Sequence, residues 1–122
     1  MSTESTLSHR LRAFGEGVDA IMDDYTDGSV LFTPDGPLTG PEPIRTFFDG
    51  LLRNSPPALL RAMTLSRRDV QGDVAYVLWK ADPFLPLATD TFVIRGGRVV
   101  ALSFAVLATA PAPESGDAVR RP

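Results

Sequence analysis

The sequence predicts a single α+β domain in which helices come first and a mostly antiparallel sheet follows. Three observations lead to this fold class. The 122 residues are enough for one hydrophobic core but not for two. In the first half of the chain, apolar residues recur at the spacing of amphipathic helices. In the second half, apolar segments with strand character alternate with turn residues. In proteins of this class, helices cover one face of the sheet.

Three helices are expected in the first half. Apolar spacing predicts the first helix over residues 7–14, after a polar stretch, residues 1–6, that we expect to be flexible. A second apolar stripe covers residues 18–25 and ends at an Asp-Gly pair. The third helix begins at Pro41. Proline suits the first turn of a helix because a backbone N–H at that position has no acceptor within the helix, so its absence costs nothing. It stops at the Asn-Ser-Pro-Pro sequence of residues 54–57.

The expected strands alternate in side-chain character and are separated by turns. They cover residues 29–33, 58–70, 74–81, 87–95 and 98–107. Gly96-Gly97 between the last two predicts a two-residue hairpin turn of the primed type. Residues 82–86 hold two prolines and are expected to form a loop. Residues 108–122 are rich in Pro, Ala and charge and predict a disordered tail.

Composition excludes several classes of function. The net charge of −3 argues against nucleic-acid binding, which usually needs a basic face. The absence of cysteine excludes disulfides and thiolate chemistry and fits a reducing cytoplasm, and with one histidine it argues against a zinc site. We expect no secretory signal and no membrane helix, because no apolar segment has the required length. No nucleotide-binding motif is present, so we expect neither a cofactor nor a metal.

Two stretches resemble the start and the end of the NTF2-like superfamily, which includes the SnoaL-like and ketosteroid-isomerase-like domains. Residues 23–48 combine an acidic helix end, an apolar strand into Pro34, an Asp-Gly pair and the sequence Ile-Arg-Thr-Phe-Phe. Residues 89–100 read TDTFVIRGGRVV. The resemblance implies a cone-shaped fold over residues 7–107, with a curled antiparallel sheet around the N-terminal helices and a pocket inside. It specifies no activity, because the superfamily includes isomerases, cyclases, hydrolases and proteins without known chemistry.

Asp90 is the main candidate for chemistry. Strand alternation places it on the same face as Phe92 and Ile94. A carboxyl group among apolar side chains loses water, which raises its pKa and allows it to donate a proton. By resemblance, Asp90 occupies the position of the strand acid that ketosteroid-isomerase-like members use as an oxyanion donor. The alternative is an outward-facing Asp90 paired with an arginine.

The other catalytic groups of those isomerases have no direct equivalent in this sequence. Thr33 stands where the general base is expected, and the tyrosine of the first helix is missing. His9 aligns with that tyrosine but lies about 200° around the helix from Leu7, toward solvent, so Leu11 is the expected pocket-facing residue. Asp35 could replace the base from the loop, although Asp-Gly after proline is also an ordinary turn sequence.

Several further side chains allow more than one interpretation. Lys80 and Asp82 could support hydrolase chemistry if they faced inward, but a solvated ion pair is the default interpretation. Trp79 could line the pocket, pack on a helix or fill a dimer interface. Asp23, Asp24 and the nearby acidic residues fit a solvated helix end rather than a metal site.

The sequence therefore favours a protein that binds a small hydrophobic molecule and leaves open whether it is an enzyme. If it is one, we expect a cofactor-free isomerase or cyclase acting on a polyketide-, steroid- or terpenoid-like substrate, with Asp90 and Asp35 as catalytic candidates. The expected ligand-binding residues are Leu31, Thr33, Trp79, Phe92 and Ile94. The alternatives are a non-catalytic ligand-binding or dimeric assembly module and, more weakly, an epoxide-hydrolase-like enzyme. A homodimer is expected from the habit of the superfamily and from the apolar outer face of a single sheet.

Overall fold

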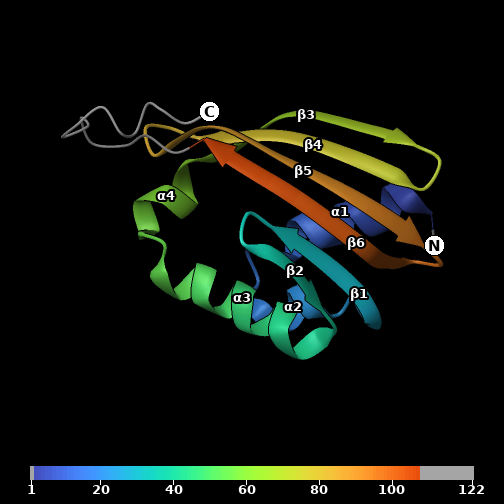
Figure 1. The fold of residues 1–122 in the computed structure, drawn as a ribbon. Coiled ribbons are helices and arrows are strands. Elements are labelled where there is room, and N and C mark those ends of the chain that lie inside the picture. The colour runs from blue at the N-terminus through green and yellow to red at the C-terminus, as the bar shows by residue number, and fades with distance from the viewer. Residues whose placement is uncertain (1, 108–122) are drawn as a thin grey trace.

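Six strands form one curled sheet in the computed structural model, which describes residues 2–107 (Figure 1). The strands are β1 (Tyr25–Thr33), β2 (Gly36–Thr39), β3 (Met63–Gln71), β4 (Val74–Ala81), β5 (Leu85–Arg95) and β6 (Arg98–Leu107). Their order across the sheet is β2-β1-β6-β5-β4-β3. All neighbours are antiparallel except β1 and β6, which are parallel. The predicted α+β class with a curled, mostly antiparallel sheet is confirmed.

The helices gather on one face of this sheet (Figure 1). They are α1 (Thr3–Ala13), α2 (Val18–Met22), α3 (Pro41–Asn54) and α4 (Pro57–Ala62). Between the helices and the sheet lies a core whose largest fully buried apolar side chains are Phe92, Leu7, Ile21, Leu31, Ile44, Ile94, Val77 and Val99. None of the helices in residues 2–107 is long and apolar enough to cross a membrane.

Helix α1 begins at Thr3, four residues earlier than the apolar spacing predicts. Ser2 caps it: its hydroxyl accepts a hydrogen bond from the Ser5 backbone N–H at 3.0 Å, and the Ser5 hydroxyl accepts one from the Ser2 backbone N–H at 3.2 Å. This reciprocal pair satisfies two donors that a helix start leaves free. Residues 3–6, expected to be flexible, therefore form the first turn of the helix.

Helix α2 ends at Met22, although the apolar stripe predicts a helix to Tyr25. Tyr25 instead starts β1, because the chain is already bonded to β6 at this point. The Val99 backbone N–H donates to the Asp24 carbonyl at 2.7 Å, and the Ser29 hydroxyl donates to the Val99 carbonyl at 2.6 Å. Sheet pairing has overridden the local helical pattern.

Two elements differ from the prediction in the middle of the chain. Residues 58–70 were expected to form one strand, but they divide into α4, a helix too short to show a clear helical period, and β3. The Pro/Gly loop after Thr33 contains the edge strand β2, where Pro37 is tolerated because an edge strand has unpaired positions.

The last hairpin has the predicted geometry. Strands β4 and β6 have the expected bounds, and β5 begins two residues early. Gly96 and Gly97 both have positive φ, 57° and 75°, as a primed two-residue turn requires. Residues 108–122, for which the sequence predicts a disordered tail, lie outside the described residues.

Candidate functional site

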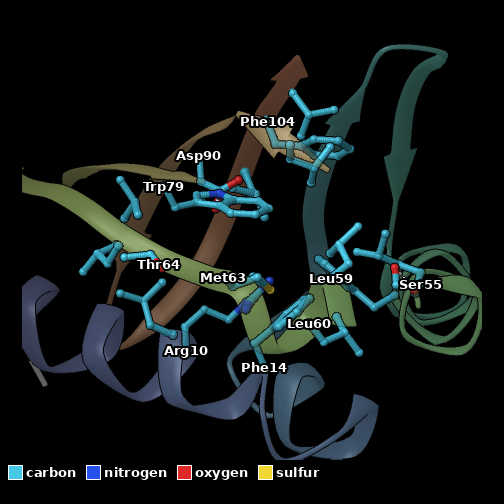
Figure 2. Close-up of a pocket in the computed structure, with 18 of the residues that line it drawn as sticks. Arg10, Phe14, Ser55, Leu59, Leu60, Met63, Thr64, Trp79, Asp90 and Phe104 are labelled. Atoms are coloured by element: carbon cyan, nitrogen blue, oxygen red, sulfur yellow. Dashed lines mark hydrogen bonds between the residues drawn. The ribbon is translucent and has the colours of Figure 1, made fainter. Parts of the chain in front are cut away.

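A cavity of about 460 Å³ lies between the helices and the concave face of the sheet (Figure 2). Its wall comes from α1, α3, α4 and strands β3 to β6. The apolar lining side chains are Leu11, Phe14, Phe47, Phe48, Leu51, Leu59, Leu60, Met63, Leu65, Val77, Leu85, Leu102, Phe104 and Val106. The remaining lining residues are Arg10, Ser55, Thr64, Trp79 and Asp90. A concave, mostly apolar site with a few convergent polar groups is the usual form of a small-molecule pocket.

The helices shape this cavity through residues that local patterns only partly indicate. Leu11 reaches it from α1 and Phe14 from the C-cap position of that helix, and both continue its apolar stripe. Leu59 and Leu60 reach it from α4, a helix in a segment for which the alternation of side chains predicts a strand. The cavity wall therefore depends on a segment whose helical form becomes visible only in the fold.

Asp90 is the acid of the cavity and extends into it from β5. Its Oδ2 accepts a hydrogen bond from the Trp79 indole N–H at 3.1 Å, and the two side chains lie together in Figure 2. Burial raises the pKa of Asp90 to about 6, while the positive charge of Arg10 and the Trp79 hydrogen bond act in the opposite direction. A carboxyl group with this pKa holds both protonation states near neutral pH and suits proton transfer.

Arg10 is the site residue that the sequence analysis missed. The residue is 4% exposed, and its side chain lines the cavity and donates from Nε to the Tyr25 hydroxyl at 3.0 Å. Burial in turn raises the pKa of Tyr25, and the Arg10 charge partly offsets this. A signal was present, because Arg10 follows Leu7 by three residues and so lies on the apolar stripe of α1. A cation in such a stripe is a candidate for a buried, functional charge.

The expected ligand-binding residues fall into two groups. Trp79 lines the cavity, whereas Leu31, Phe92 and Ile94 lie in the adjoining core, with exposed fractions of 0%, 1% and 1%, and are not part of the cavity wall. Asp90 does share a face with Phe92 and Ile94, as alternation predicts. The difference lies along the strand: helix packing covers the Phe92–Ile94 end, and only the Asp90 end remains open to the cavity.

Thr33 and Asp35 form a turn rather than a pocket wall. The Thr33 hydroxyl accepts from the Asp35 backbone N–H at 3.0 Å and donates to the Gly36 carbonyl at 2.9 Å. Asp35 is exposed, and neither residue lines the cavity. Their contacts match the turn interpretation of the Pro-Asp-Gly sequence.

Lys80 and Asp82 form an ion pair at 3.4 Å, with side chains 45% and 58% exposed. Neither lines the cavity. Their position corresponds to the solvated pair that was the default interpretation, and it leaves the hydrolase alternative without the inward-facing groups that it needs.

His9 and Asp24 are more buried than the sequence suggested. His9 Nδ1 lies 2.7 Å from Asp24 Oδ2, and the side chains of the two residues are 35% and 7% exposed. Asp24 is therefore not part of a solvated helix end, and His9 points to this partner rather than to open solvent. Both belong to a separate polar depression with Arg98, outside the apolar cavity. Across residues 2–107, no cluster of three or more acidic or histidine side chains could hold a metal ion.

The fold is shared with solved structures of low sequence identity. No family model and no curated protein matches the chain. A SnoaL-like protein of unknown function from Burkholderia thailandensis is 18% identical, with a TM-score of 0.68 over 86% of this chain and 94% of that chain. A candidate polyketide cyclase from Sinorhizobium meliloti is also 18% identical, with a TM-score of 0.68 over 83% and 94%. A candidate ketosteroid isomerase from Kribbella flavida is 12% identical, with a TM-score of 0.66 over 98% and 88%.

The chain thus has the NTF2-like fold that the sequence resemblance predicts. The matched proteins are SnoaL-like, cyclase-like and isomerase-like, and at these identities the likeness concerns the fold alone. Any activity has to be argued from the cavity.

Proposed function

We propose that this protein binds a small hydrophobic molecule in the apolar cavity and isomerises or cyclises it by proton transfer through Asp90. The observation that carries the proposal is a single carboxyl group, with a pKa raised to about 6, in a wall that is otherwise mostly apolar. Strongly perturbed acids in clefts are typical of acid/base sites. A polyketide-, steroid- or terpenoid-like ketone suits the size and apolar character of the cavity.

The chemistry follows from the charge state of Asp90. Above about pH 6 the carboxylate form dominates, and it can remove a proton from the carbon beside a carbonyl group to leave an enolate. The protonated Asp90 then returns the proton to another carbon, which completes an isomerisation. In a cyclisation, the enolate carbon attacks a second carbonyl of the same molecule, and Asp90 protonates the alkoxide that forms. The Trp79 hydrogen bond holds the carboxylate in place.

Hydrogen–deuterium exchange tests this proposal without knowledge of the natural substrate. Cyclic enones and cyclic 1,3-diketones are incubated in D₂O, and loss of the proton beside the carbonyl is followed by NMR. We expect the protein to accelerate exchange of at least one probe, and Asp90→Asn to reduce that acceleration by about a hundredfold or more. Asp27→Asn, at an exposed carboxylate, is the matched control and should exchange at the unmodified rate. Equal rates for the Asp90 variant and the unmodified protein would refute the role of Asp90.

A non-catalytic ligand-binding module is the second candidate. It is favoured by the lack of a second acid at the site, because Asp90 is the only acid among the described residues that line the cavity. In this case the apolar probes raise the thermal unfolding midpoint, but none exchanges faster than in buffer. The two measurements together separate the candidates.

We also propose that two copies pair through the outer face of the sheet. Three exposed apolar residues each stand next to a fully buried residue in their strand, so they lie on the side of the sheet away from the helices. They are Phe32, Val74 and Leu87, with exposed fractions of 49%, 43% and 45%. Such apolar exposure is typical of an interaction surface. Light scattering at micromolar concentration should give twice the mass of one chain, and Phe32→Lys should halve it. A single-chain mass for the unmodified protein contradicts the dimer.

A further inference from the structure

Arg10 is a buried cation with unused hydrogen-bond donors. A guanidinium group carries five N–H bonds and stays positively charged in proteins. In the part of the chain that the structure describes, only Nε has a hydrogen-bond acceptor, the Tyr25 hydroxyl at 3.0 Å. Within residues 2–107, the two terminal amino groups make no hydrogen bond and no ion pair. Four N–H bonds of this residue, which is only 4% exposed, thus have no acceptor within residues 2–107.

Aromatic rings stabilise this charge but do not replace the missing acceptors. The guanidinium carbon lies 4.9 Å from the ring centre of Phe48 and 5.7 Å from those of Tyr25 and Phe92. Such cation–π contacts favour a buried arginine. However, a ring face cannot accept in-plane hydrogen bonds from the terminal amino groups, and an unsatisfied buried donor is unfavourable. The aromatic rings therefore stabilise the guanidinium charge at this position, while the N–H groups of its terminal amino groups can still donate to a ligand.

The position of Arg10 connects these free donors with the acid. Arg10 lines the cavity from α1 and Asp90 lines it from β5 (Figure 2). The Arg10 charge acts on Asp90 electrostatically, but the two side chains form no direct ion pair. An oxygen atom bound between them would accept hydrogen bonds from the guanidinium while the adjacent carbon faced the carboxylate.

We propose that Arg10 binds the carbonyl oxygen of the ligand and stabilises it as an oxyanion, so that the ligand class is an apolar ketone that can form an enolate. This inference rests on the proposed function and adds the oxygen-binding residue. When Asp90 takes the proton, its negative charge disappears and an equal charge forms on the oxygen beside Arg10. The net charge of the cavity is unchanged, and the fixed cation favours the charge at its new position.

Two aromatic probes of similar size test the role of Arg10. 2-Naphthol can bind as an oxyanion, whereas 2-methoxynaphthalene cannot lose a proton. We expect Arg10→Gln to weaken naphthol binding about tenfold or more, as for loss of a hydrogen bond to a charged group, and to leave the ether unaffected. Arg10→Lys should retain part of the preference. Arg12→Gln, at an exposed arginine of the same helix, is the matched control and should bind both probes normally.

The ionisation of the bound naphthol is a second readout that a structural role of Arg10 would not change. It is measured by absorbance in the Asp90→Asn background, which removes the competing carboxylate. We expect Arg10 to lower the pKa of the bound naphthol, and Arg10→Gln to abolish this effect. Equal weakening of both probes by Arg10→Gln, or equal ionisation with and without Arg10, would overturn the inference. If Arg10→Gln fails to fold, Arg10→Lys and the comparison of the two probes on the unmodified protein decide the question.

The outcomes for the two proposals are separable. Naphthol binding through Arg10 without ketone exchange in the unmodified protein would retain the oxygen-binding site and reject the enzyme. Ketone exchange that depends on Asp90 but not on Arg10 would retain the enzyme and reject the oxygen-binding role.

Discussion

Asp90→Asn will stabilise the protein at pH 8 by about 3 kcal/mol and will change its stability little at pH 4. The pKa of Asp90 is about 6 in the folded protein, against 3.8 for the ordinary group. Between these values the folded state binds the proton more tightly, so the stability of the unmodified protein falls as the pH rises. Above pH 6 the full penalty applies, at about 1.4 kcal/mol for each pH unit between the two pKa values. Asparagine is neutral at every pH and removes this penalty.

Urea unfolding of both proteins at pH 4 and pH 8 measures this difference. Asp27→Asn, at an exposed carboxylate, is the control and should show no gain that depends on pH. A gain of the same size at both pH values would show that shape or packing, rather than the charge of Asp90, is responsible. The predicted combination of higher stability and lost proton exchange is typical of a functional residue held in an unfavourable environment.

Phe92→Ala will lower the free energy of unfolding by about 4 kcal/mol, the usual loss for a buried aromatic side chain. Phe92 is 1% exposed in the core, and its ring is one of the three that surround the Arg10 guanidinium. The substitution therefore leaves a void and also removes a cation–π contact. Because Phe92 does not line the cavity, any effect on ligand binding should follow from its support of Arg10.

The matched control is Phe32→Ala, which removes the same ring from a side chain that is 49% exposed. Urea unfolding should show a loss below about 1 kcal/mol for this variant when the chain is monomeric. If the proposed dimer covers Phe32, its loss will depend on protein concentration, whereas the loss at Phe92 will not. A loss for Phe92→Ala as small as that expected for Phe32→Ala would contradict the placement of Phe92 in the core.

Local patterns in the sequence were sufficient for much of the fold. The bounds of β4 and β6, the start of α3 at Pro41 and the Gly96-Gly97 turn follow from neighbouring residues alone. The period-two alternation of β5 also indicated correctly which face carries Asp90. These features depend on propensity, backbone geometry and periodicity, which act over a few residues.

Long-range packing decided the features that the patterns could not indicate. The parallel pairing of β1 with β6 joins residues about 70 positions apart and draws Tyr25 out of the predicted helix. Helix α4 is too short for its period to be distinguished from that of a strand. The contact between His9 and Asp24 likewise depends on how α1 lies against the start of β1.

The sequence by itself determined the class of fold and the side of the sheet on which Asp90 lies. Only the tertiary structure decided that Asp90 opens into a cavity while Phe92 and Ile94 are covered, and that Arg10 is buried beside it. The physical reason is that periodicity reports which side of an element is apolar, but not which other element covers it. Solvent exposure, and with it the pKa of Asp90 and the free donors of Arg10, is a property of the assembled layers.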